Sequence, residues 1–239
     1  MTSSSDGHYE DVASSAAAPP RTASARIPRS SRTWLLLYLL AGLVNLTGHL
    51  LGSRFLFGLG LVLAMPMLIG FVVSQRKSTS RRRNRLVLLV LVALAFSWLG
   101  DATGPFFLLK VLMFLVAQTC YVVAFWPYRR TSVWSRPTML LAYVAVLAVL
   151  VAVAARDAGA LGVPVVVYGV SLTLMATLST GLNRLTGLGG ALFVLSDAIL
   201  ALDTFVGWFQ LPDAPLWNIA SYLAAQLLLV WGCCRGPVP

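Results

Sequence analysis

Long stretches of apolar residues are the feature that most limits how this chain can fold. A bilayer is spanned by helices of about 20 mostly apolar residues, because hydrocarbon offers the backbone no hydrogen-bond partners. The 239 residues are 58% hydrophobic and 11% charged, whereas soluble domains carry about 25% charged residues. This composition excludes a soluble globular fold and a disordered chain. The apolar residues do not alternate with polar ones, which excludes a membrane β-barrel.

Eight apolar runs are long enough to form membrane helices. They cover residues 33–51, 54–74, 86–102, 105–126, 138–155, 162–181, 188–207 and 215–232. No long loop separates them, so we expect an all-α polytopic membrane protein with a single eight-helix domain over residues 33–232. The preceding residues 1–32, rich in Ser, Ala and Pro, are expected to form a disordered tail. Residues 233–239 are expected to form a short C-terminal stub.

Basic residues are distributed unevenly over the two sides of this arrangement. Fifteen of the 18 Lys and Arg fall on the side of the two termini, Arg54 and Arg156 on the other, and Lys110 within the fourth helix. Short cytoplasmic loops are enriched in Lys and Arg, so both termini are predicted to be cytoplasmic. The net charge of +10 then reports topology, with weak attraction to anionic lipids, and no nucleic-acid partner is expected. We expect a multi-pass protein of the plasma membrane.

One short pattern occurs twice in the chain. Asp101 and Asp197 are each followed, on the next predicted helix, by an aromatic-Leu-x-Ala-Gln segment that ends at Gln118 and Gln226, respectively. Four helices separate the two copies, which predicts a parallel four-plus-four repeat about an axis normal to the membrane.

Acidic residues inside the apolar runs are the main candidates for function, because an ionised carboxylate within a membrane costs several kcal/mol. Asp197 lies near the middle of its run, and Asp101 and Asp203 lie near the outer ends of theirs. One interpretation is that Asp101 and Asp197 line a polar pocket in the outer half of the bundle. The alternative is that each is a structural hydrogen-bonding group or pairs with Lys110.

Several polar side chains could accompany these carboxyl groups. Tyr222 and Gln226 are four residues apart on the last helix, Gln118 and Tyr121 are three apart on the fourth, and Tyr168 lies on the sixth. Such spacings place two side chains on one helix face. They could bind a substrate in a wet interior or form hydrogen bonds between helices.

Several chemistries are excluded. The chain has two His, too few for a three-His zinc site. No phosphate-binding loop, dinucleotide fingerprint or serine-hydrolase elbow occurs. We therefore expect neither a metal nor a cofactor.

Four segments resemble the YhhN-type lysoplasmalogenase family. They are Gly190–Leu202, which contains Ser196-Asp197, Phe96–Asp101, Tyr168 with Met175, and Tyr222–Gln226. Their order and spacing cover residues 54 to 232. The resemblance implies an eight-helix membrane hydrolase without cofactors, surrounded by membrane lipids. It would cleave the vinyl-ether bond of a lysophospholipid, lysoplasmalogen, to a fatty aldehyde and glycerophosphoethanolamine or glycerophosphocholine. It also points to Asp101 and Asp197 as the catalytic residues.

The chain departs from the family pattern at three places. The segment from Leu63 to Met67 lacks the Lys often found there, Gln118 stands where a His is common, and Lys110 replaces a usual Gly. These departures leave the head group open, and the sequence does not give the oligomeric state.

The implied reaction assigns roles to the two carboxyl groups. A protonated acid must donate to the outer vinyl carbon, and a negative group must stabilise the resulting cation. Asp197, deeper in the membrane, is the candidate acid, because burial favours a protonated carboxyl group; Asp101 is the candidate base. The predicted substrate-binding residues are Tyr222, Gln226, Gln118, Tyr121, Tyr168 and Lys110. A non-catalytic carrier of lipids or small molecules is the alternative, since midplane polar groups also occur in transporters. A membrane protein with purely structural Asp residues is a third.

Overall fold

The computed structural model describes residues 29–75, 81–104 and 106–235, without the side chains of residues 81, 82 and 157. The expected disordered tail therefore lies outside the described residues, except for its last four positions. All secondary structure in the described part is helical. Its eight long helices are α1 Arg29–Leu50, α2 Arg54–Ser74, α3 Arg81–Ala102, α4 Phe107–Phe125, α5 Pro137–Asp157, α6 Gly162–Ser179, α7 Arg184–Phe205 and α8 Ala214–Arg235. Three short turns of 3₁₀ helix join some of them: η1 Trp126–Thr131, η2 Val133–Ser135 and η3 Gly159–Leu161.

Each of these eight helices is long and apolar enough to cross a membrane, which confirms the predicted fold class. Several helices extend beyond their apolar runs. α1 begins at Arg29 rather than residue 33, α7 at Arg184 rather than 188, and α8 continues to Arg235 rather than ending at 232. Arg is a good helix former whose long side chain can reach the membrane surface. A helix boundary drawn where the apolar residues stop therefore lies inside the true helix end.

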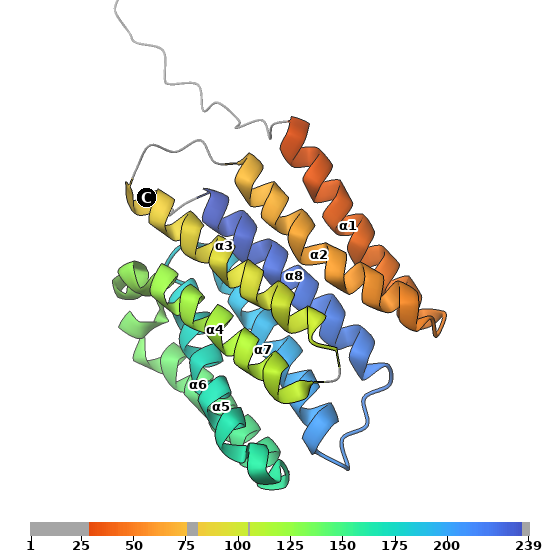
Figure 1. The fold of residues 1–239 in the computed structure, drawn as a ribbon. Coiled ribbons are helices and arrows are strands. Elements are labelled where there is room, and N and C mark those ends of the chain that lie inside the picture. Colours follow the sequence, from red (N-terminus) through yellow and green to blue (C-terminus); the bar gives the residue numbers. More distant parts are fainter. Residues whose placement is uncertain (1–28, 76–80, 105, 236–239) are drawn as a thin grey trace, which may run out of the picture.

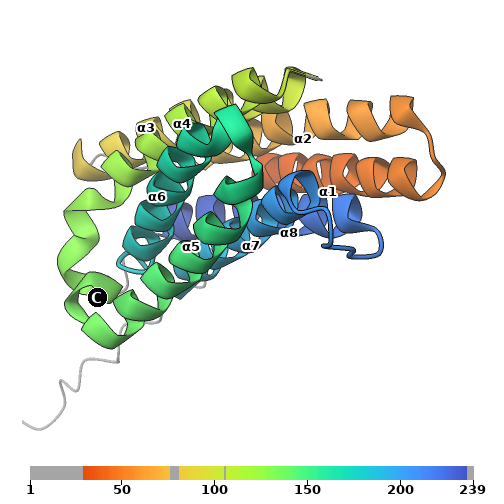
Figure 2. The same cartoon turned by 90° about the horizontal axis from the view of Figure 1, so that it is seen from below.

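The helices form one bundle with a clear order from side to side (Figure 1). The α1–α2 pair lies at one side, α5 and α6 lie at the other, and α3, α4, α7 and α8 lie between them (Figure 1 and Figure 2). The starts of α1, α3 and α7 and the end of α8 lie at one end of the bundle. This end also carries most of the described arginines. The cytoplasmic placement of both termini and the internal repeat stay predictions.

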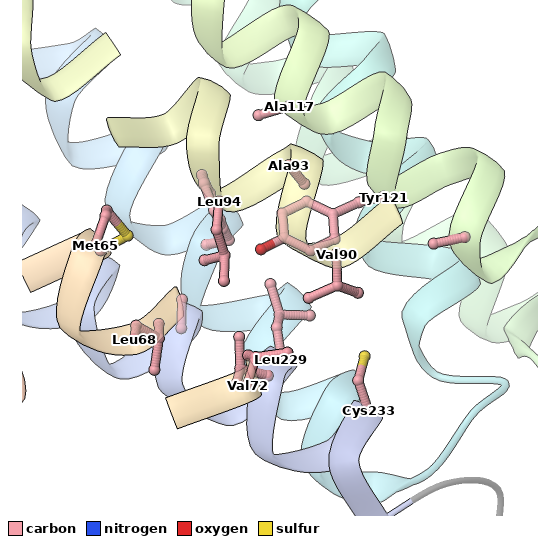
Figure 3. Packing of buried hydrophobic residues seen from close by; sticks show 14 of the residues in the cluster. Met65, Leu68, Val72, Val90, Ala93, Leu94, Ala117, Tyr121, Leu229 and Cys233 are labelled. Carbon is pink, nitrogen blue, oxygen red and sulfur yellow. The ribbon is translucent and has the colours of Figure 1, made fainter. Parts of the chain in front are cut away.

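The core is a close-packed apolar cluster between the central helices. Met65, Leu68, Leu94 and Leu229 are fully buried there. Figure 3 shows Leu94 and Leu229 near the Tyr121 ring, with Met65 and Leu68 on the α2 side of the cluster. Among the α5 residues whose side chains are described, Ala154 alone is buried. The α5 helix is therefore peripheral, and most of its apolar side chains face outward, as expected for a surface in contact with lipid.

Glycines bring the helices of this bundle into backbone contact. A Cβ atom at Gly189 would clash with the backbone of Leu229 on α8, and one at Gly190 with Ser179 and Ala176 on α6. These glycines therefore permit close packing of α7 against its neighbours.

Pro66 leaves one carbonyl group of α2 without its helical partner. Proline has no N–H, so the Val62 carbonyl oxygen cannot accept the usual hydrogen bond from residue 66. The indole Nε1–H of Trp98, on α3, donates to this oxygen at 2.9 Å. A side chain of α3 thus supplies the hydrogen bond that the α2 backbone lacks. An apolar environment requires such a partner, because no water is available there.

We predict that Trp98→Phe lowers the free energy of unfolding by about 1 kcal/mol, because the Val62 carbonyl group loses its donor. In the Pro66→Ala background the new N–H of residue 66 supplies that hydrogen bond, so Trp98→Phe should cost less. Thermal unfolding of the four variants in detergent measures this coupling. Equal costs in both backgrounds would contradict the compensation.

Candidate active site

A partly open cavity lies at the end of the bundle opposite most of the arginines, with about 820 Å³ of space when the solvent at its mouth is included. It lies where α3 and α7 end and α4, α6 and α8 begin. Asp101 and Asp197 both line it, together with Tyr168, Tyr222 and Lys110. The remaining lining is mostly apolar. The structure therefore brings together five of the eight predicted site residues, from five different helices.

Each carboxyl group is held by one tyrosine. The Tyr222 hydroxyl group on α8 donates to Oδ2 of Asp101 at 2.8 Å. The Tyr168 hydroxyl group on α6 donates to Oδ2 of Asp197 at 2.6 Å. Within the described part of the chain, the second oxygen of each carboxyl group has no hydrogen bond. Both groups are thus oriented by a phenol and retain one oxygen for another partner.

The two carboxyl groups differ in their surroundings. Asp197 is the fourteenth residue of the 22-residue α7, whereas Asp101 is next to last in α3, so Asp197 lies deeper along the bundle, as expected. The exposure of the two side chains shows the opposite order. Asp101 is 9% exposed, while Asp197 is only half-buried because it also faces a gap beside the peripheral helix α5. Depth along a helix therefore does not give side-chain burial here.

Aromatic rings support the Tyr222–Asp101 pair. The Tyr222 ring packs edge-on against Phe114 and Phe193, with centroid distances of 5.7 and 5.6 Å. This packing fixes the ring that carries the donating hydroxyl group.

Lys110 adds a positive charge to the cavity. It is the fourth residue of α4 and lies in the cavity wall. Among the described residues Lys110 forms no ion pair within 4.0 Å, whereas His49 and Asp213 lie 3.8 Å apart. Lys110 therefore makes no direct ion pair with Asp101 or Asp197 within this distance, and its role in the site stays a prediction. Asp203 is exposed near the end of α7, outside the cavity.

Tyr121 and Gln226 do not line the cavity. The Tyr121 hydroxyl group donates to Oε1 of Gln226 at 2.7 Å, and Nε2 of Gln226 donates to Ser97 Oγ at 3.1 Å. All three side chains are buried. Direct contact of Tyr121 and Gln226 with a substrate stays a prediction, and the structure gives both side chains partners within the protein. Tyr121 and Gln226 point into the core rather than into the cavity. With Ser97 they link α4, α8 and α3 by hydrogen bonds.

Gln118 also lies outside the cavity lining, in a different situation. Its side chain is fully buried, and neither amide atom has a hydrogen-bond partner among the described residues. The amide lies beside Tyr168 without hydrogen-bonding geometry. A buried amide without a partner is costly. A direct role in substrate binding stays a prediction for this residue.

Two polar residues in the cavity wall were not predicted. Ser196 donates to Oδ1 of Asn218 at 2.9 Å, and both side chains line the cavity. The sequence did indicate Ser196, because this residue directly precedes Asp197 in the segment that resembles the family. Asn218 follows the start of the last helix and carried no pattern of its own. In the described ranges, no three His, Cys, Asp or Glu lie together as a metal site.

An eight-helix membrane protein with a pair of carboxyl groups in one cavity is the class that this fold and site define. The model of the YhhN family matches residues 59–233. The chain belongs to the YhhN family.

Curated relatives match a shorter part of the chain. Lysoplasmalogenase TMEM86B of Rattus norvegicus is 45% identical over 74 residues, which is 31% of each chain. The protein of the same name from Homo sapiens is 47% identical over 78 residues, 32% of this chain and 33% of its own. The Mus musculus protein is 42% identical over 74 residues, 31% and 32% of the two chains. The alignments thus span about a third of these relatives. No solved structure matches the chain.

We predict opposite stability effects for two buried glutamines. Gln118→Met removes an amide that has no partner, so the unfolding temperature should be unchanged or higher. Gln226→Met breaks two hydrogen bonds and should cost about 1–3 kcal/mol. Thermal unfolding of both variants in the same detergent makes the comparison. Equal destabilisation would mean that the Gln118 amide is satisfied by a partner such as a bound water.

Proposed function

We propose that this protein is a membrane-embedded hydrolase that cleaves the vinyl-ether bond of lysoplasmalogens. The products would be a fatty aldehyde and glycerophosphoethanolamine or glycerophosphocholine. The observation that carries the proposal is that Asp101 and Asp197, on separate helices, line one cavity and are each held by a tyrosine. Membership of the YhhN family and the lysoplasmalogenase names of the partial relatives support it.

Two carboxyl groups suffice to balance this reaction. Asp197, protonated, donates its proton to the outer vinyl carbon, which leaves an oxocarbenium ion on the carbon bonded to oxygen. Ionised Asp101 stabilises this cation and removes a proton from the attacking water. The hemiacetal then collapses. Its ether oxygen takes the proton from Asp101, and its hydroxyl proton returns to Asp197, which restores both groups.

The other cavity residues support this chemistry. Tyr168 and Tyr222 would fix the orientation of the two carboxyl groups, and each leaves one carboxyl oxygen for substrate or water. Lys110 offers a positive charge to the phosphate of the head group. Asn218 retains its amide N–H groups as donors, since Ser196 occupies its oxygen. The glycerophosphate end of the lipid would therefore lie against α4 and α8.

We also propose a setting for the site. Most of the described arginines lie at the other end of the bundle, and with both termini cytoplasmic the cavity would open towards the outer leaflet. The plasma membrane is the compartment that we assign, with a lysophospholipid as the substrate partner.

The first test removes each carboxyl group without changing its shape. We expect Asp197→Asn and Asp101→Asn each to lower the rate of aldehyde release from lysoplasmalogen at least about a hundredfold. Asp203→Asn, on the same helix as Asp197 but outside the cavity, is the matched control and should retain the wild-type rate. Full activity in either of the first two variants would remove that residue from the mechanism. Wild-type protein that inserts but releases no aldehyde would refute the function.

The second test concerns the head group. We expect Lys110→Met to raise the KM for lysoplasmalogen about tenfold while kcat changes little, because a charge-assisted contact with phosphate of about 1.5 kcal/mol is lost. An alkenyl glycerol without phosphate should show no such change. An equal loss on both substrates would contradict a phosphate contact.

A further inference from the structure

A second cavity adjoins the site on the side of the peripheral helix α5. It lies between α5, α6 and α7 and has about 480 Å³ of space when the solvent at its open side is included. Four residues belong to the walls of both cavities: Val165, Tyr168, Asp197 and Ala201. The two spaces therefore meet at the Tyr168–Asp197 hydrogen bond. We call the second space the α5–α6–α7 cleft.

The walls of this cleft are almost entirely hydrocarbon. Apart from the shared Tyr168–Asp197 pair, Thr173 is the one polar side chain among the residues that line it. Small residues make the space: Ala154, Gly169, Ala198 and Ala201. A Cβ atom at Gly169 would already come within 3.0 Å of Leu147. Such a surface favours an apolar occupant, because burying hydrocarbon there costs no hydrogen bonds.

The cleft runs lengthwise through the bundle. On α6 its wall extends from Val165 to Thr173, a rise of about 12 Å along a helix. On α7 it extends from Ala201 back to Val194, away from the site and towards the arginine-rich end. A lipid in one leaflet has the same orientation, with its head group at the surface and its chain pointing to the bilayer centre.

We propose that the α5–α6–α7 cleft holds the hydrocarbon chain of the lipid whose head group occupies the site cavity. This proposal rests on the proposed function. The vinyl-ether bond joins the head group to the chain, so it would lie where the two cavities meet. Its outer carbon belongs to the chain side and would face Asp197, while the carbon bonded to oxygen would face the site cavity and Asp101.

This placement also explains which carboxyl group acts as the acid. Asp197 lines both cavities, whereas Asp101 lines only the first. The proton must reach the carbon on the chain side, so the carboxyl group at the junction is the one in position. The half-buried state of Asp197 then reflects the space kept for the chain.

Substitutions at two depths test the proposal. Val194 lies at the far end of the cleft, Ala198 lies one turn nearer the site, and neither lines the site cavity. We expect Val194→Phe to lower kcat/KM at least about tenfold for a hexadecenyl lysoplasmalogen and to leave an octenyl substrate within about twofold. Ala198→Phe should lower both. Leu195→Phe is the matched control, because Leu195 is 49% exposed on the same helix and lines neither cavity.

Two further measurements keep the outcomes separate. Leu147→Trp would fill the cleft from the peripheral helix α5, where Leu147 lies beside Gly169. It should reproduce the Val194→Phe profile if that variant fails to fold. Binding of unreactive alkyl lysophospholipids of the same two chain lengths reads chain placement without chemistry. Chain-length preferences equal to wild type in rate and binding would overturn the cleft proposal alone. Length-dependent binding without aldehyde release would instead refute the hydrolase function.

Discussion

The structure depends on one constraint: a polar group surrounded by hydrocarbon must find its hydrogen-bond partner within the protein. The Val62 carbonyl group, deprived of its partner by Pro66, takes the indole N–H of Trp98. The two Asp carboxyl groups take a phenol each. These structural and candidate catalytic groups are satisfied in the same way, by a side chain from another helix, whereas the buried Gln118 amide is not. The site therefore depends on correct packing of the bundle and on no single segment.

The apolar runs alone predicted eight helices, the cost of buried charge selected Asp101, Asp197 and Asp203, and the family resemblance pointed to the first two. The inferences from apolar runs and from buried charge each use the sequence of a single helix and no information on its neighbours. Tyr121 and Gln226 show where such reasoning stops. Helical spacing shows which side chains share a face, but it does not show which neighbouring helix that face meets, or at what height. For the same reason the Ser196–Asn218 contact could not be predicted, since it depends on how α7 and α8 are aligned.

The first helix lies outside the stretch that the family model matches, yet it supports the site. Asn45 on α1 donates to the Phe57 carbonyl group on α2, and the Tyr38 hydroxyl group donates to the carbonyl group of Leu223. Leu223 follows Tyr222, the phenol that holds Asp101. The first helix thus anchors the α8 backbone directly beside the site.

The Tyr222–Asp101 hydrogen bond has a consequence for biogenesis. It joins Asp101 on α3 to Tyr222 on α8, two residues that are 121 positions apart in the sequence. During synthesis on the ribosome, Asp101 enters the membrane with α3, when five further described helices have yet to be made. Its phenol partner arrives only with the last of them. Until then the carboxyl group must keep contact with water or with the insertion machinery, so a chain released before α8 is complete cannot assemble this half of the site.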